Sequence, residues 1–173
     1  MNGALTDDER RVVGAAQRLG LILSSDWPAV AAHLLVQGAD GQAVSELAGL
    51  PRAASPWRVD RLVPEVMVDL GIREMPADQV TELLARMVGS VVSGQPHADD
   101  FAAIRLLARL APVLDYPGGA ISDAYSASEW LDCACHANSS ERDAAIALEG
   151  TLRAAEPVDA DRGLLQALTA TWF

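Results

Sequence analysis

The sequence predicts an all-α fold, built as an irregular multi-helix bundle or as a short stack of helix pairs. Apolar residues recur at intervals of three and four along most of the chain, which is the spacing of one helix face. No segment alternates polar and apolar residues as a half-buried strand does. Capping residues and glycine stops divide the pattern into eight or nine helices of modest length. A length of 173 residues fits a single helical domain over residues 1–173.

The first four helices are predicted from their ends as well as from their apolar faces. Thr6 and Glu9 have the spacing of a capping box, which starts the first helix. The starts of the next three are Ser25 or Asp26, Asp40 and Ser55, and their ends are Gly38, Gly49 and Gly71. Pro64 lies inside the fourth pattern. Because proline has no N–H for the helix ladder, it should kink or divide that helix.

The second half of the chain contains the clearest helix, which follows Pro76. Its apolar residues form one complete stripe: Val80, Leu83, Leu84, Met87, Val88, Val91 and Val92. Residues 98–114 are apolar around most of the helix, which predicts a position at the centre of a bundle. After a loop at residues 115–119, helices are expected from Ser122 or Asp123, from Ser140 and from about Asp159.

Composition and charge exclude several kinds of chemistry. All 13 basic residues are arginine, so the chain has no lysine for a Schiff base or for general-base catalysis. The formal net charge is −11. Residues 114–173, here called the acidic segment, carry three arginines against ten acidic residues. This segment should repel nucleic acid and anionic membranes, and it should attract a basic partner.

The sequence predicts neither export nor membrane insertion. Its N-terminal segment is acidic, whereas a secretory signal has a basic start and then an apolar stretch. No apolar run approaches the ~18 residues that a membrane span needs. Cys133 and Cys135 are one residue apart, and a disulfide between them would close a small strained ring. We therefore expect a cytoplasmic protein that does not associate with membranes.

One alternative function is a helix-turn-helix-like transcriptional regulator. Residues 42–52 have the pattern of a short helix and a turn of small residues, and the next helix carries Arg58 and Arg61. Arginine can contact phosphates and guanine edges. Against this, the turn is long, Pro64 lies in the second helix, and the basic surface typical of DNA-binding proteins is missing. A related alternative is a helical small-molecule sensor that uses residues 38–61 or a pocket between helices.

A second alternative is a metal- or thiol-dependent enzyme. In a helix that reaches His136, four potential zinc ligands share one face: Glu129, Asp132, Cys133 and His136. Ligands on one helix point nearly parallel, so His97 or His33 would have to complete the site. Cys133 could also act as a nucleophile, with His136 or His97 as its base. Because no glycine-rich elbow or oxyanion signature accompanies them, we assign no catalytic residue and expect no cofactor.

The leading hypothesis is a protein-interaction surface. Trp27 and Trp57 each lie beside a proline in the first turn of a helix, and packing explains both. Trp130 lies between acidic residues, a setting that suits the arginine or lysine of a basic protein partner. The predicted partner-binding residues are Tyr116, Tyr125, Glu129, Trp130 and Asp132. The oligomeric state is open, and a homodimer is one option.

Several short motifs lie between residues 26 and 72. They are residues 27–38, which begin Trp-Pro-Ala-Val, then Asp40, residues 47–50, residues 61–65 and residues 70–72. This part of the chain resembles small uncharacterised actinobacterial helical proteins, some of which are similar to immunity proteins of toxin–immunity systems. The resemblance implies a helical fold and a binding role, and it carries over no functional residue. The leading hypothesis then takes the form of a non-catalytic immunity-type inhibitor that binds a basic partner through residues 115–161.

Overall fold

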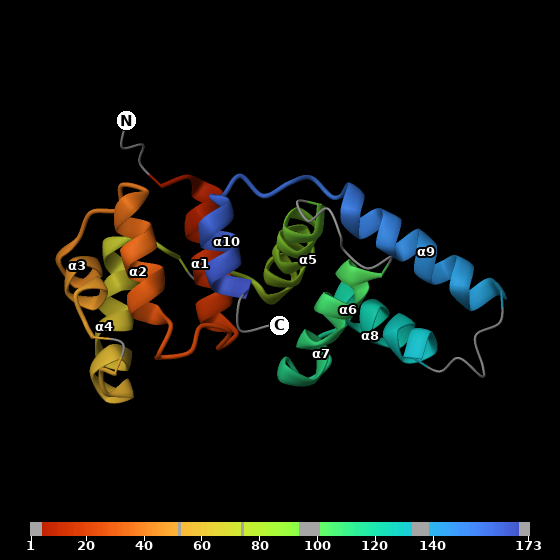
Figure 1. Cartoon of the computed structure of the whole chain (residues 1–173), viewed down its shortest axis with the longest axis horizontal. Helices are drawn as coiled ribbons and strands as arrows, with labels where there is room; N and C mark the ends of the chain where they lie inside the picture. Colours follow the sequence, from red (N-terminus) through yellow and green to blue (C-terminus); the bar gives the residue numbers. More distant parts are fainter. Residues whose placement is uncertain (1–4, 52, 74, 94–100, 133–138, 170–173) are drawn as a thin grey trace. The chain divides into compact units, whose positions relative to one another are not determined.

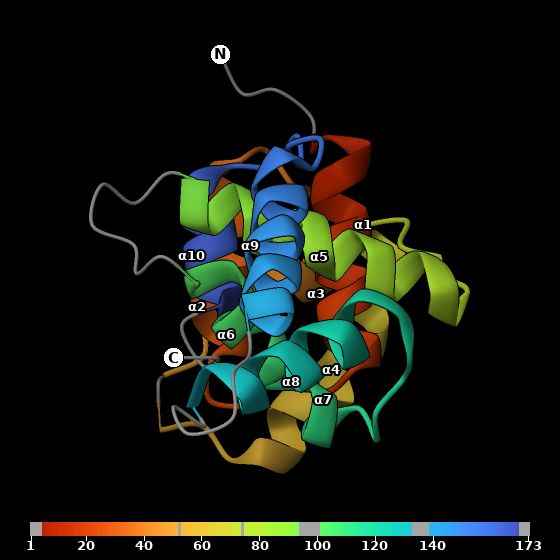
Figure 2. The same ribbon diagram turned by 90° about the vertical axis from the view of Figure 1, so that its right-hand side faces the viewer.

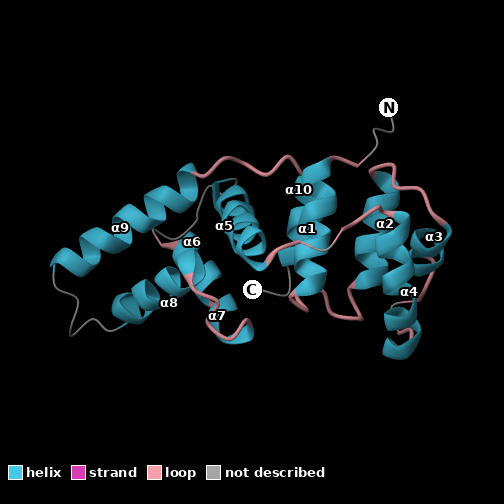
Figure 3. Ribbon diagram, turned by 180° about the vertical axis from the view of Figure 1, so that it is seen from behind, coloured by secondary structure: helices cyan, strands magenta, loops and turns pink. Residues whose placement is uncertain are grey.

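The computed structural model describes residues 5–51, 53–73, 75–93, 101–132 and 139–169, and in these ranges it is helical with no strand (Figure 1, Figure 3). The predicted fold class is therefore confirmed. The described helices are α1 (Asp7–Arg18), α2 (Trp27–Val36), α3 (Gln42–Ala48), α4 (Pro56–Asp69), α5 (Ala77–Ser93), α6 (Ala102–Ala108), α7 (Leu110–Val113), α8 (Gly119–Asp132), α9 (Ser139–Ala154) and α10 (Arg162–Thr169). Arg109 alone separates α6 from α7, so the ten described segments become nine, within the expected eight or nine, when that pair counts as one interrupted helix.

The described helices form two compact units. Unit 1 comprises Met1–Met75 and Asp159–Thr171, and it contains α1–α4 and α10. Unit 2 comprises Pro76–Val158 and contains α5–α9. That both units belong to one domain, as the chain length predicts, stays a prediction. In either unit, none of the described helices has the combination of length and apolarity that a bilayer crossing requires.

Unit 1 begins at the capping box that the sequence predicts. The Thr6 hydroxyl accepts the Glu9 N–H at 3.1 Å, and the Glu9 carboxylate accepts the Thr6 N–H at 2.8 Å. α10, although distant in sequence, packs against α1 and α2 (Figure 1). The core contains the indole of Trp27, which is 2% exposed and donates to Gln17 at 3.2 Å. The packing role predicted for Trp27 is therefore confirmed.

The start of α3 differs from the sequence expectation. Its N-cap is Gly41, not Asp40. Because glycine has no side chain, the cap residue itself cannot offer a side-chain acceptor to the first N–H groups of the helix. The carboxylate of Asp69, at the end of α4, accepts the Ala43 N–H at 2.8 Å and the Val44 N–H at 3.4 Å. A remote carboxylate thus satisfies the N–H groups that a local cap was expected to satisfy.

The sequence predicts a kink or a division at Pro64; α4 runs from Pro56 to Asp69 through this proline, so the division does not occur. A proline inside a helix leaves the carbonyl four residues earlier without its N–H donor. Here that carbonyl belongs to Asp60. Both Asp60 and Pro64 lie on the exposed side of α4, where water can hydrate the carbonyl oxygen.

Unit 2 is organised around α5 and α6. All the apolar residues predicted as the stripe of α5 are buried. Gly89 of α5 lies against α9, and a Cβ at this position would collide with the carbonyl oxygen of Leu152, so the close helix approach depends on glycine. α6 is buried around most of its circumference and packs against α5, α8 and α9 (Figure 2). This confirms the central position predicted for it.

Candidate functional site

The residues predicted to bind a partner lie in unit 2, on α8 and on the loop before it. α8 carries Tyr125, Glu129, Trp130 and Asp132, and Tyr116 lies in the loop between α7 and α8. Asp115 and Tyr116 have φ angles of 54° and 52°, a left-handed conformation that residues other than glycine rarely adopt. The Tyr116 N–H donates to the Ala111 carbonyl at 2.8 Å, which fixes the loop against the end of α7.

Tyr116 and Tyr125 form an aromatic pair. Their ring centroids lie 5.0 Å apart and their planes meet at 81°, an edge-to-face contact. The hydrogen bond with Tyr116, and then the negative charge of Glu129, raise the pKa of Tyr125 above its ordinary value of 10.0. Tyr125 therefore remains a neutral phenol next to a carboxylate, with a hydroxyl that can donate or accept a hydrogen bond.

Trp130 does not lie with the tyrosine pair. An α-helix turns by about 100° per residue, so Trp130 is about 140° around α8 from Tyr125, whereas Glu129 and Asp132 are within about 40° of it. The predicted residues therefore form two surfaces. The tyrosine flank consists of Tyr116, Tyr125, Glu129 and Asp132, and the tryptophan flank consists of Asp123, Ser126 and Trp130. Trp130 is 40% exposed, and α8 contains three acidic residues and no basic residue.

One acidic residue of unit 2 serves inside the fold. Glu149 of α9 is buried, and its carboxylate accepts the Ala103 N–H at 3.1 Å and the Ile104 N–H at 2.9 Å. Arg153, one turn later, donates to the same carboxylate at 2.7 Å. Glu149 thus caps α6 from a neighbouring helix, and the cap and the ion pair offset the cost of burying its charge. No local pattern marks this role, because the capped groups lie 46 and 45 residues away.

Asp161 has a similar capping role in unit 1. It accepts the N–H groups of Gly163 at 2.8 Å and Leu164 at 3.1 Å, and its Oδ1 lies 2.6 Å from Nε2 of His33. Desolvation raises the pKa of Asp161, but the hydrogen bonds from His33, Leu164 and Gly163 outweigh it and leave that pKa below 3.8. His33, considered above as a remote zinc ligand, is therefore engaged with a helix cap.

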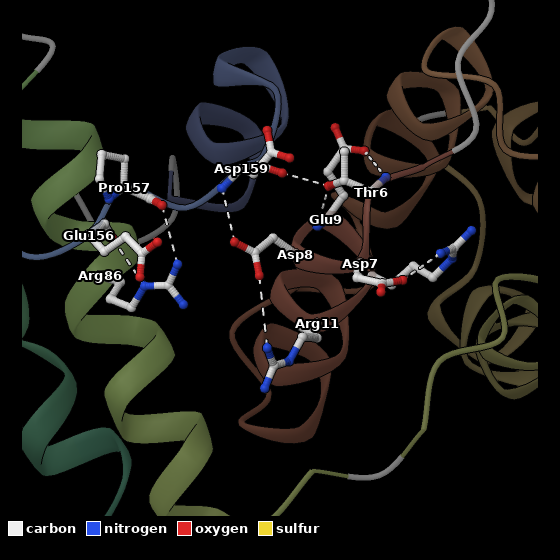
Figure 4. A network of polar contacts seen from close by, with 10 residues as sticks. Thr6, Asp7, Asp8, Glu9, Arg11, Arg86, Glu156, Pro157 and Asp159 are labelled. Carbon is white, nitrogen blue, oxygen red and sulfur yellow. Dashed lines mark hydrogen bonds and ion pairs between the residues drawn. The ribbon is translucent and has the colours of Figure 1, made fainter.

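The acidic start of α1 is also engaged within unit 1. Asp8 accepts the Asp159 N–H at 3.0 Å, and the Thr6 hydroxyl donates to the Asp159 carbonyl (Figure 4). These contacts fix the chain that enters α10 to the start of α1. Within unit 2, Arg86 of α5 holds the chain that leaves α9 by donating to the carbonyl of Glu156 at 3.0 Å (Figure 4). Part of the acidic charge therefore has a structural role.

The predicted metal pair, Cys133 and His136, lies outside the described residues, and so does His97. Within the described ranges, no three His, Cys, Asp or Glu side chains gather in a way that could hold a metal ion. Glu129 and Asp132, the other two members of the predicted face, are exposed on α8. The metal- or thiol-dependent alternative stays a prediction from sequence spacing.

Packing, the explanation that the sequence favours for Trp57, is wrong for this residue, because it is 71% exposed. The Arg61 guanidinium lies over its ring, 5.4 Å from the centroid. On the same helix, Arg58 forms an ion pair with Glu46 of α3 at 3.6 Å. Both arginines of the helix-turn-helix hypothesis thus have a partner inside unit 1. Exposed contacts of this kind contribute about 1 kcal/mol or less, so they would not prevent the arginines from contacting DNA. The helix-turn-helix hypothesis therefore stays a prediction.

Two cavities of unit 1 lie at the surfaces of α1 and α4. The first has a volume of about 230 Å³ and is lined by Gly14, Gln17, Arg18, Met67, Ile72, Arg73 and Met75. The second has a volume of about 190 Å³ and is lined by Gln17, Gly20, Ile22, Trp27, Asp60, Val63 and Pro64. The lining of the first is mostly apolar and includes Arg18, which donates to the Met75 carbonyl, and Arg73, a combination that suits a small anion with an apolar body.

Comparisons with protein-family models, with curated proteins and with solved structures give no match to this chain. The resemblance of residues 26–72 to small actinobacterial helical proteins stays a prediction. The candidate site rests on the residues themselves, and its best-defined surface is the pair of acidic, aromatic flanks on α8.

Proposed function

We propose that this protein is a non-catalytic protein-binding module that receives a basic segment of its partner on α8. The observation that carries the proposal is the surface of α8 and of the loop before it, where the exposed rings of Trp130 and Tyr116 accompany three acidic residues of α8 and no basic residue of that helix. Aromatic side chains supply contact area and a face for a cation, and the carboxylates supply the complementary charge. This combination recognises arginine and lysine side chains.

The tyrosine flank is the more preorganised of the two surfaces. The left-handed loop holds Tyr116 against Tyr125 before any partner arrives, so little ordering remains to oppose binding. Glu129 and Asp132 lie on the same side of α8 and can each pair with a cationic side chain. An immunity-type inhibitor of a basic toxin is the specific form of this proposal, supported by the charge of α8 and by the resemblance of residues 26–72.

Fluorescence anisotropy of a labelled arginine–glycine peptide tests the proposal. The variant Glu129→Gln/Asp132→Asn should weaken binding by about fivefold or more, because two charge-assisted contacts are lost. The control Asp40→Asn/Asp143→Asn makes the same change in net charge at exposed positions off α8 and should leave affinity nearly unchanged. Binding should also weaken as salt rises.

Two outcomes would contradict the proposal. Equal weakening of peptide binding by both double variants would mean that the peptide responds only to the net charge of the protein and does not bind α8 specifically. An equally tight complex with a glutamate–glycine peptide would mean that charge plays no part. The variant Trp130→Ala tells which flank of α8 the peptide covers. It should weaken binding of a peptide on the tryptophan flank and leave binding on the tyrosine flank unchanged.

A small-molecule sensor is a second candidate, favoured by the first cavity of unit 1. Its volume of about 230 Å³ exceeds the ~150 Å³ that holds benzene and lies below the ~300 Å³ typical of drug-sized sites. Hexanoate should raise the thermal unfolding temperature more than hexanol or hexylamine. Arg73→Gln should abolish that preference, and Arg58→Gln, which lies outside the cavity, should keep it. Equal effects of all three probes would argue against an anion site.

A further inference from the structure

The outward face of α4 carries an aligned set of exposed side chains. Trp57, Arg61, Pro64 and Val68 are all exposed, and Trp57 and Val68 are 71% and 79% exposed. Their spacing of four, three and four residues places them on one stripe of the helix, the spacing of a coiled-coil seam. The opposite side of α4 is buried in unit 1 through Val59, Leu62, Val63 and Val66. α4 is therefore apolar on two faces, and only one is covered within the described residues.

Single exposed apolar residues are ordinary, but here three of them, Trp57, Pro64 and Val68, align on one stripe of α4 and form an elongated, largely apolar surface. Two charged residues accompany the stripe, four positions apart. Arg61 contacts the ring of Trp57, and Glu65 makes no ion pair or hydrogen bond within the described residues. Arg61 on the stripe and Glu65 at its edge thus supply one positive and one negative side chain, and a second α4 running in the opposite direction presents the same two charges in reverse order.

We propose that this stripe binds a second copy of the chain, with the two α4 helices antiparallel and the two-fold axis level with Val63. A two-fold axis makes the contact self-complementary, so each contact occurs twice. In this register Arg61 meets Glu65 of the second copy, and Glu65 meets Arg61. Trp57 then packs against Val68 of the second copy, which covers both large apolar side chains.

Charge complementarity selects this occupant and this orientation. A parallel pair would place Arg61 beside Arg61 and Glu65 beside Glu65, and like charges in contact oppose association. The antiparallel register pairs every one of these charges with its opposite. A single helix pair buries less than the ~1,200 Å² of a standard interface, so the dimer should be weak, with a Kd on the order of 100 µM.

Sedimentation equilibrium over a range of protein concentrations tests the proposal. Val68→Ser should raise the dimer Kd about tenfold, because it removes apolar contacts from both ends of the interface. Val36→Ser is the matched control, since Val36 is 74% exposed on α2 and lies off the stripe, and it should leave the Kd unchanged. Circular dichroism checks that both variants keep their helices.

A charge exchange tests the register directly. Arg61→Glu alone places a new carboxylate against Glu65 of the second copy, and Glu65→Arg alone places arginine against arginine, so each protein by itself should be monomeric. A mixture of the two variants restores two opposite-charge contacts and should form a heterodimer about as tight as the wild-type dimer. A wild-type chain that stays monomeric at millimolar concentration, equal weakening by Val36→Ser and Val68→Ser, or a mixture that stays monomeric would each overturn the proposal.

Discussion

α4 and α8 are both 14-residue helices with an exposed tryptophan, Trp57 on α4 and Trp130 on α8, but their charges differ. α4 carries two arginines and three acidic residues, whereas α8 carries three acidic residues and no arginine. A helix of mixed charge can complement a copy of itself, and a helix of one sign repels a copy and attracts a basic partner. The net charge of −11 conceals this difference, because it adds together helices with different charge patterns.

The largest effect on the free energy of unfolding should come from Glu149, which caps α6, the helix on which α8 packs. Glu149→Ala leaves two N–H groups of α6 without an acceptor and removes the carboxylate that Arg153 contacts. We expect a loss of about 3 kcal/mol in the free energy of unfolding, measured by urea titration. Because α8 packs on α6, the loss of stability at α6 should also weaken peptide binding to α8.

The control for this prediction is Glu156→Ala. Glu156 is also acidic and follows α9, but its side chain is exposed, so its removal should change the free energy of unfolding by about 0.5 kcal/mol or less. Glu149 belongs to unit 2 and α4 belongs to unit 1. Under conditions in which unit 1 stays folded, the Glu149→Ala variant should still dimerise through α4. A loss no larger than that of Glu156→Ala would show that the cap contributes little.

A smaller effect is expected on the α4 side. Asp69→Ala removes the carboxylate that caps α3 and should cost about 1 kcal/mol. Asp40→Ala makes the same change at the position where the sequence places the cap, and it should be nearly neutral. Urea unfolding of both variants distinguishes the two assignments, and the reverse order of effects would return the cap to Asp40.

The smallest effect concerns the tyrosine flank of α8. Glu129→Gln removes a negative charge that raises the pKa of Tyr125. The ionisation of Tyr125, followed by absorbance at alkaline pH, should therefore move to lower pH, towards the ordinary tyrosine pKa of 10.0. The hydrogen bond with Tyr116, the larger cause, keeps part of the shift. Asp143→Asn on α9 should leave the titration unchanged. An unchanged titration in Glu129→Gln would mean that the carboxylate does not face Tyr125 in solution.

Local pattern predicted most of the fold. The stripe of α5, the capping box of α1 and the central position of α6 all follow from the spacing of apolar and capping residues, and the structure confirms each. These features depend on neighbours within about two helical turns, so the sequence displays them directly. Pro64 shows the limit, since whether a proline divides a helix depends on whether water reaches the orphaned carbonyl.

The candidate site was predicted less completely. Grouping Glu129, Trp130 and Asp132 by their proximity in sequence placed them on one surface, although the helical period separates Trp130 from the other two. The two first-turn tryptophans have similar local settings, yet Trp27 is buried and Trp57 is exposed. No neighbouring residue distinguishes them, because burial depends on which helix packs over each ring.

The sequence by itself determined the helical class, most helix boundaries and the acidity of residues 114–173, because these depend on local spacing and composition. The tertiary structure alone decided which acids became caps, as Glu149 and Asp69 did for helices 45 and 26 residues away. It also decided that a stripe of α4 is exposed among the residues that the structure describes. Both outcomes require distant segments to meet, and a remote carboxylate or a covering helix is chosen by packing geometry and not by the residues beside it.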